Sequence, residues 1–454
     1  MPEPQPSPTE INEFQRAMSR MAKLVARPAK IEDTGLSDGF LSDLAAKHIL
    51  TSGVLTIAEL SKRMGLAGAI VERLLKFMRD EARIEVRPRI GCEQTLSYAL
   101  TERGRNSALD AMMRSGYVGP APVPLKQYAS VARAQSIHNR KISKSDMHLA
   151  FDDLVLAPSL VDKLGPSMNS GRAVFLYGPA GTGKTYVSQR LVRLFNDLVF
   201  VPHAVSIDDI VVQIFDHQLH KAINTKNSSD AIMLGKGFDP RFNLCERPVA
   251  VTGGELTGDM LEIRYDHAAR IYEAPLQLKA NNGLFIIDDM GRQRITPAEL
   301  FNRWIVPLEE KRDYLDLGSG KHFSTPFDVV LIFSTNIHPL ELADEAFLRR
   351  IGYKIEFKPL TPDAYTEIWN QSCRENRVLC EPSVLDYVIN DLHAVNNVPL
   401  LPCHPRDLIG MAMDYATYSG DPQQIRETHL NWAWHNYFVS VKDYVDPTEK
   451  QLAV

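Results

Sequence analysis

The stretch FLYGPAGTGKTYVSQR, residues 175–190, places three glycines within six residues and follows them directly with Lys184. An apolar run comes before these glycines, and a helical pattern comes after them. Glycine enters left-handed backbone conformations without a steric penalty, so this concentration predicts a tight loop between a strand and a helix. Amides in such a loop can turn inward onto an anion, and the helix N-terminus adds the positive end of its dipole. The stretch therefore predicts a phosphate-binding loop.

The spacing of these residues matches the motif G-x-x-x-x-G-K-[ST], here residues 178–185, in the strand-to-helix context that the motif requires. In this motif Lys184 reaches the β- and γ-phosphates of a nucleotide, and the Thr185 hydroxyl ligates Mg²⁺. We therefore predict a nucleotide site whose contacts are Gly178, Pro179, Ala180, Gly181, Thr182, Gly183, Lys184 and Thr185.

A second apolar run, LFIIDD at 284–289, ends in two carboxylates. Ligands of open α/β sheets bind outside the carboxyl ends of the strands, so both acids are well placed. We predict that Asp288 holds Mg²⁺ and that Asp289 polarises the attacking water. Two acids after a strand more often form a solvated strand end, and it is the upstream phosphate loop that favours the catalytic interpretation.

Apolar runs alternate with helical patterns from about residue 172 onward. The runs AVFLYG, LFIIDD, VVLIFSTN and YKIEF predict buried strands of a parallel sheet covered on both faces, which is a three-layer α/β fold. Strand patterns stop after residue 358. We assign residues 146–358 to the α/β nucleotide-binding domain and residues 359–454 to a helical lid with C-terminal helices.

The N-terminal third has a different organisation. Residues 1–30 begin with a proline-rich, apolar-poor stretch and are predicted to be disordered. Three helical patterns and two β-like pieces in residues 31–118 predict a winged helix-turn-helix domain. Residues 119–145 open with GPAPVPL, whose prolines predict a stiff linker.

Two functions of the winged-helix domain stay open. Arg83, Arg87 and Arg89 gather near the predicted hairpin, where they could meet DNA phosphates. However, residues 31–115 contain 12 acidic and 12 basic side chains, whereas dedicated DNA-binding domains are commonly basic. DNA binding and protein docking are therefore both compatible with the sequence.

The composition sets further bounds. The 454 residues predict two or three domains, and a net charge of −5 provides no global field toward nucleic acid or membrane. The five cysteines form no C-x-x-C pair, which favours scattered reduced thiols. We find no signal peptide and no apolar run of membrane-spanning length, so the sequence predicts a cytoplasmic protein.

Residues 146–440 resemble an AAA+ ATPase through motifs in the family's order. GPAGTGKT corresponds to Walker A and LFIIDD to Walker B. Asn336, at the end of VVLIFSTN, corresponds to sensor 1, and Arg406, in HPRDLIG, to sensor 2. DEAFLRRIGYKIEF is similar to the segment that carries the arginine finger, Arg349 or Arg350. The general spacing is most like the MoxR-type and related bacterial members.

This resemblance implies ATP and Mg²⁺ as cofactors and ATP hydrolysis as the activity. Asn336 would hold the attacking water, and Arg406 would bind nucleotide and sense the γ-phosphate. Arg349 or Arg350 would act on a neighbouring subunit's nucleotide, which implies a homo-oligomer such as a hexameric ring. The implied function is remodelling or assembly of a protein client. The alternative is an ATP-gated regulator that binds DNA through the winged helix.

Two features depart from the family pattern. Asp289 stands where the family usually has glutamate, and its shorter side chain predicts slow, switch-like hydrolysis. Residues 222–283 form an unusually long piece between the first units and Walker B. Long loops in compact domains are usually functional or mobile, so we expect either a binding insertion or a surface excursion there.

Overall fold

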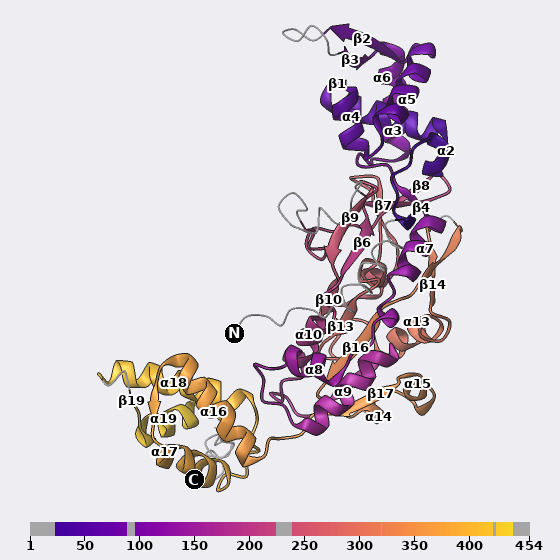
Figure 1. The fold of residues 1–454 in the computed structure, drawn as a ribbon. Coiled ribbons are helices and arrows are strands. Elements are labelled where there is room, and N and C mark those ends of the chain that lie inside the picture. The colour runs from indigo at the N-terminus through magenta and orange to yellow at the C-terminus, as the bar shows by residue number, and fades with distance from the viewer. Residues whose placement is uncertain (1–22, 89–95, 224–237, 319, 421–423, 439–454) are drawn as a thin grey trace, which may run out of the picture.

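A computed structural model of the chain describes residues 23–88, 96–223, 238–318, 320–420 and 424–438. Figure 1 shows an extended arrangement of four parts. An N-terminal helical unit lies at one end, followed by a β-rich middle region, then a sheet with helices around it, and finally a C-terminal helical unit. Among the described residues, no helix has the length and apolarity that a membrane crossing requires.

The N-terminal unit has the predicted order of helices and hairpin. A three-stranded antiparallel sheet, in the order β1-β3-β2, packs beside the helices. Gly65 ends α4 with φ 66°, so the tight turn uses the left-handed conformation that glycine favours. The elements are α2 (Ile31–Thr34), α3 (Asp38–Ser52), β1 (Val54–Thr56), α4 (Ile57–Met64), α5 (Gly68–Asp80), β2 (Ile84–Pro88), β3 (Leu96–Leu100) and α6 (Glu102–Arg114).

Residues 119–145, which we predict to be a linker that opens with the stiff segment GPAPVPL, contain regular secondary structure over much of their length. This segment forms β4 (Val123–Pro124), α7 (Leu125–Ala134) and η1 (Ile137–Asn139), and α8 (Lys144–Ala150) begins within it. β4 pairs with a strand of the middle region, and the α7 side chains of Tyr128 and Val131 are 4% and 1% exposed. The prolines start a strand and a helix here, because apolar side chains at helical spacing follow them.

Ordered structure also begins earlier than predicted. Residues 23–30 were assigned to a disordered terminus, yet Val25 is fully buried in a cluster with Phe200 and Phe242. Its carbonyl accepts a hydrogen bond from the Asp239 amide at 2.8 Å. The rest of the predicted disordered segment, residues 1–22, lies outside the described residues.

The middle region is built from small sheets. One has five strands in the order β11-β12-β8-β7-β4, and two are antiparallel pairs, β6-β9 and β14-β15. Its strands are β6 (Leu198–Pro202), β7 (Ala204–Ile207), β8 (Ile210–Gln213), β9 (Phe242–Glu246), β11 (Arg264–Asp266), β12 (Ile271–Glu273), β14 (Arg312–Asp316) and β15 (His322–Pro326). Ala204 and Val211 belong to the same apolar cluster as the N-terminal helices, so these two parts share a core.

The main sheet is parallel throughout and has the order β10-β13-β16-β5-β17. Four of its strands confirm the predicted apolar runs: β5 (Val174–Tyr177), β13 (Leu284–Ile287), β16 (Val330–Thr335) and β17 (Tyr353–Glu356). The fifth, β10 (Val249–Thr252), lies inside the long piece that we expected to be an insertion or excursion. That expectation is therefore wrong for β10, which is the edge strand of the main sheet.

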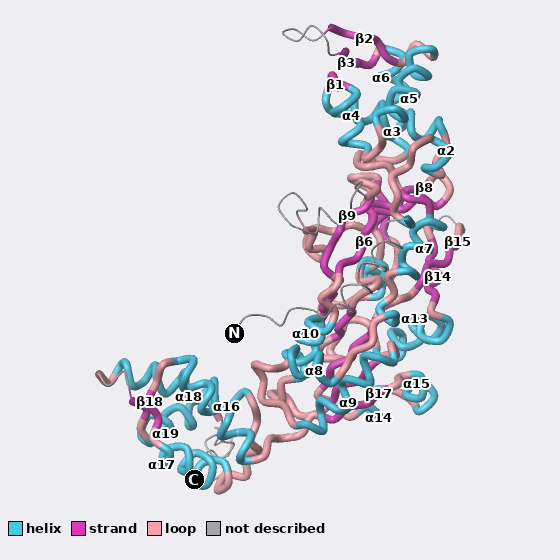
Figure 2. Tube along the Cα trace, viewed as in Figure 1, coloured by secondary structure: helices cyan, strands magenta, loops and turns pink. Residues whose placement is uncertain are grey.

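Alternate residues of these strands enter two different apolar clusters, and so the sheet is covered on both faces (Figure 2). Val174 and Leu176 face α8, α9 (Pro158–Ser170) and α10 (Lys184–Arg190), which continues as η2 (Leu191–Leu194). Phe175 faces α13 (Pro297–Glu310) and α15 (Glu345–Arg350) on the other side. Short elements complete this part: η3 (Gly258–Leu261), α12 (Leu276–Lys279) and α14 (Pro339–Leu342).

The C-terminal unit is helical, as predicted, and has its own core around Tyr365, Trp369 and Leu408. A backbone hydrogen bond of 2.8 Å joins the Leu360 amide to the Leu400 carbonyl at its base. Its elements are α16 (Pro362–Asn376), β18 (Leu379–Cys380), α17 (Pro382–Tyr387), η4 (Val388–His393), α18 (Cys403–Tyr418), β19 (Gln424–Ile425) and α19 (Glu427–Tyr437).

Candidate nucleotide-binding site

The loop between β5 and α10 has the backbone that a phosphate-binding loop needs. Gly178, Gly181 and Gly183 have φ of 142°, 81° and 84°. A Cβ on Gly178 would lie 2.2 Å from the Phe357 carbonyl oxygen, and so only glycine fits there. Gly183 precedes the first residue of α10, which directs the amides of that helix toward the loop.

Lys184 lies under this loop and is only 6% exposed. Its Nζ donates hydrogen bonds to the carbonyls of Gly178 and Pro179 and to Oδ1 of Asn336, each at 2.8 Å. Burial lowers the pKa of Lys184, while Asp288 and Asp289 act in the opposite direction. The side chain thus joins the loop to the end of β16. Thr182 donates to the Pro179 carbonyl, and Ala180 is exposed on the loop.

Thr185 and Asp288 meet across the sheet edge. The Thr185 hydroxyl donates a hydrogen bond of 2.7 Å to Oδ2 of Asp288. A hydroxyl and a carboxylate are hard oxygen ligands of the kind that Mg²⁺ prefers, and Mg²⁺ commonly takes its other ligands from phosphates and water. The two predicted metal ligands therefore fit that ion.

Asp289 and Asn336 are exposed at the neighbouring strand ends. Nδ2 of Asn336 lies 3.5 Å from Oδ1 of Asp289, so the amide contacts both Lys184 and this carboxylate. Asp289 has φ 48°, a left-handed conformation that is unusual for a residue other than glycine. The structure thus brings Lys184, Thr185, Asp288, Asp289 and Asn336 together at the carboxyl edge of the sheet.

Arg406 is not bonded to these residues. Its side chain is 77% exposed, and its Nε lies 3.3 Å from Asp407. Cys403, one helical turn earlier on α18, packs on the phosphate loop, because a Cβ on Gly181 would lie 2.5 Å from the Cys403 sulfur. Arg406 therefore sits on the helix that contacts the loop, with its guanidinium directed to solvent.

The two candidate finger residues have different surroundings. Arg349 is 81% exposed and pairs with Glu345 on its own helix at 3.5 Å. Arg350 is 31% exposed, and its Nε lies 2.5 Å from Glu309 on α13. Arg349 thus pairs within its own helix, whereas Arg350 joins α15 to α13.

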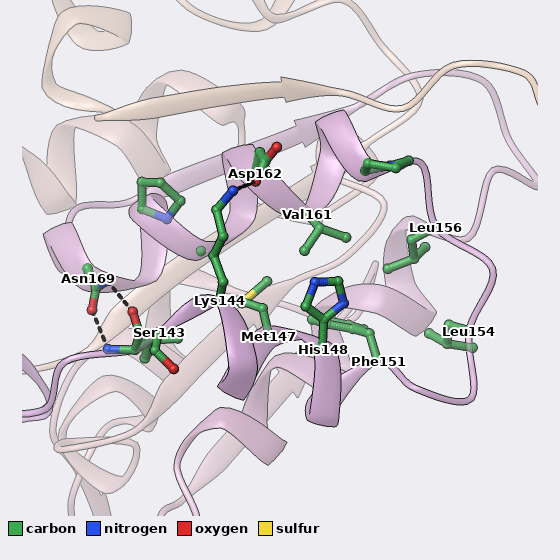
Figure 3. Close-up of a pocket in the computed structure, with 14 residues that line it drawn as sticks. Ser143, Lys144, Met147, His148, Phe151, Leu154, Leu156, Val161, Asp162 and Asn169 are labelled. Atoms are coloured by element: carbon green, nitrogen blue, oxygen red, sulfur yellow. Dashed lines mark hydrogen bonds and ion pairs between the residues drawn. The ribbon is translucent and has the colours of Figure 1, made fainter.

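A cavity of about 380 Å³ lies between α8 and α9 (Figure 3). Met147, His148 and Phe151 line it, and an ion pair of 3.2 Å between Lys144 and Asp162 crosses its rim. None of the predicted nucleotide contacts is among its lining residues. This cavity is thus separate from the phosphate loop.

Two of the three arginines predicted to meet DNA form ion pairs within the N-terminal unit. Arg83 is 8% exposed and pairs with Asp43 at 2.7 Å and with Glu81 at 3.6 Å. Arg87 pairs with Glu85 on its own strand at 2.5 Å. Arg89 lies outside the described residues. Arg83 is therefore held in a buried ion pair, whereas the Arg87 guanidinium is exposed beside a carboxylate.

Sequence reasoning missed Gln293, whose side chain binds the backbone of both Asp288 and Asp289. Gln293 lies in the segment DDMGRQR, and none of the sequence motifs used above has a glutamine at that position. It also missed Cys403 against the phosphate loop, because that contact joins two distant segments of the chain.

A family model described as a domain of unknown function, DUF8689, matches residues 361–436, which form the C-terminal helical unit. No curated protein matches the chain. The assignment of the central part of the molecule therefore depends on its own features, which are a parallel sheet and a glycine loop between β5 and α10. The chain has a P-loop α/β core.

Several solved structures align with this chain at low identity. The Thermotoga maritima RuvB Holliday junction branch migration motor is 15% identical over 70% of this chain and 78% of its own, with a TM-score of 0.34. NtrX from Brucella abortus is 12% identical over 77% of this chain and 70% of its own, with a TM-score of 0.39. Scores this low do not establish a shared fold.

Proposed function

We propose that this chain is an ATPase of the AAA+ type that binds Mg²⁺-ATP at the carboxyl edge of its parallel sheet. The observation that carries the proposal is the pair of contacts that converge there. Lys184 reaches Asn336 at 2.8 Å, and Thr185 reaches Asp288 at 2.7 Å. Each contact joins the glycine loop to a different strand end, and a purely structural turn would not need polar groups at all three.

The roles follow from the chemistry of each group. Amides of the glycine loop and the Lys184 ammonium would hold the phosphates. Thr185 and Asp288 would hold Mg²⁺, which when bound neutralises charge on the triphosphate. Asp289 would accept the proton of the attacking water, and Asn336 would orient that water. Because aspartate is shorter than glutamate, we propose slow turnover.

We further propose that the active form is a homo-oligomeric ring acting on a protein client. Arg349 is the better candidate for a finger in the neighbouring site, because it is exposed and its partner lies on the same short helix. An arginine supplied in trans is worth about 10³–10⁵ in rate, so activity should rise with protein concentration. Arg406 would turn toward the phosphates when α18 moves on the loop.

Replacing Asp289 with asparagine should retain ATP binding and lower turnover by about 10²–10⁴-fold, because the amide cannot accept the proton. Calorimetry measures the binding and phosphate release measures the turnover. Asp208→Asn is a matched control, since Asp208 is also exposed and in the left-handed conformation. Equal turnover in the native chain and the Asp289 variant would exclude the proposed role.

We assign the N-terminal unit to protein docking, as a winged-helix module, rather than to DNA binding. Arg83 and Arg87 are paired with carboxylates, and apolar side chains stand exposed on α5 and the hairpin: Phe77, Val86 and Leu96 at 40%, 37% and 56%. Burying these apolar atoms against a protein would lower the free energy of the system.

Duplex DNA should accordingly bind weakly, and Arg87→Ala should change its affinity by less than about two-fold, since the Glu85 carboxylate beside it opposes attraction to phosphate. Fluorescence anisotropy at two salt concentrations measures this. Tight, salt-dependent binding that Arg87→Ala abolishes would instead favour the DNA-binding regulator.

A further inference from the structure

The chain reverses sharply after β13, where the two carboxylates of the candidate site stand. Asp289 has φ 48°, and Gly291 follows with φ 103°. A left-handed aspartate is maintained only where its surroundings determine it. The contacts around this turn therefore decide where the Asp289 carboxylate lies.

Gln293 makes three side-chain hydrogen bonds to the backbone of this turn, and the Thr335 hydroxyl makes another, to the Met290 carbonyl. Nε2 of Gln293 donates to the carbonyls of Asp288 at 2.8 Å and Asp289 at 3.2 Å. Oε1 of Gln293 accepts from the Gly291 amide at 2.8 Å. A side-chain amide carries a neutral donor and an acceptor on one planar group, and glutamine has the length that places both against this turn.

The same side chain reaches the segment that follows β10. Nε2 of Gln293 lies 3.4 Å from the Gly253 carbonyl, and the Gly253 amide donates to Glu255 at 2.9 Å. One residue beyond Gln293, the Arg294 amide donates at 3.2 Å to the carbonyl of Leu256, which is fully buried. The turn after β13 and the turn after β10 are thus held as one piece.

We propose that Gln293 is a positioning residue, which holds the Asp289 carboxylate for water attack and ties it to the turn at residues 253–256. Its catalytic consequence rests on the proposed ATPase function, but the positioning itself does not. Movement of the 253–256 turn would reach Asp289 through this amide and through the backbone hydrogen bonds that join the two turns.

The first test is Gln293→Glu, which has the same shape but places an acceptor against two carbonyl oxygens. The kcat for ATP should fall about 10–100-fold, the effect of misplacing a reacting group by about 1 Å, while KM stays within about two-fold. Gln213→Glu is the control, since Gln213 is also half-buried and donates to a single carbonyl, that of Phe215. An unchanged kcat, or an equal fall in the control, would overturn the catalytic role.

The second test needs no nucleotide. Hydrogen exchange of the peptides covering residues 253–256 and 288–293 should accelerate in Gln293→Glu, with the remaining peptides unchanged. Unchanged exchange in both peptides would overturn the positioning role, whatever the ATPase assay gives. Faster exchange in a chain that does not hydrolyse ATP would support the positioning and reject the proposed function.

Discussion

Replacing Lys184 with alanine is expected to lower the affinity for Mg²⁺-ATP by about 10²–10⁴-fold. The side chain would supply about two charge-assisted hydrogen bonds to phosphate oxygens, each worth about 1.5–3 kcal/mol, and about 1.4 kcal/mol is a tenfold change in affinity. Calorimetry with a non-hydrolysable ATP analogue and Mg²⁺ measures the dissociation constant directly.

This loss must be separated from a local collapse of the loop, because Lys184 also binds the Gly178 and Pro179 carbonyls. Lys184→Met keeps most of the side-chain volume and should lose affinity to a similar degree. Lys221→Ala is the control, since Lys221 is 78% exposed and pairs only loosely with Glu246 at 4.0 Å. Native affinity in both Lys184 variants would contradict the nucleotide site itself.

Replacing Arg241 with alanine is expected to destabilise the N-terminal and middle regions together by about 3–5 kcal/mol, the cost of leaving one buried charge unpaired. Arg241 and Asp239 are both fully buried, with Nη2 of the arginine 2.8 Å from Oδ2 of the aspartate. Nη1 of Arg241 also donates to the carbonyls of Thr34 at 3.0 Å and Pro122 at 3.4 Å. This one guanidinium therefore joins the N-terminal helices to the strands behind them.

Hydrogen exchange measured at increasing urea concentrations gives the loss of stability for each region separately. Arg264→Ala provides the comparison, because Arg264 is 69% exposed and its pair with Glu273 should contribute at most about 1 kcal/mol. Replacing both Asp239 and Arg241 with leucine should recover part of the loss, since no charge is then left unpaired. Unchanged exchange of α3 and α6 in Arg241→Ala would show instead that the N-terminal unit folds alone.

Residues 119–145 are packed rather than extended as a linker, because their side chains are buried together with other parts of the chain. Sequence reasoning correctly recognised the prolines at 120–124, but their effect on the backbone is the same in a free linker and at the entrance to a packed helix. The choice depends on partners far along the chain. Gln135, for example, donates to the Phe200 carbonyl and to Asn282, and neither partner is visible from the local pattern.

β10 shows the same limit. Nothing in its short run, VAVT, distinguishes a strand of the main sheet from a hairpin strand of an insertion, and its place comes from pairing with β13 at the sheet edge. The arginines of α15 show it as well, because their sequence context is nearly identical while their exposures are 81% and 31%.

The sequence by itself determined the glycine loop after β5, four strands of the parallel sheet, the helices of both terminal units and the two carboxylates after β13. These features depend on glycine spacing, apolar periodicity and motif order, which act between neighbours in the chain. Only the tertiary structure decided that Gln293 bonds to the backbone of Asp288 and Asp289, that Arg241 joins two regions and that Arg83 and Arg87 pair with carboxylates. Those contacts link separate elements, and packing alone sets which side chains meet.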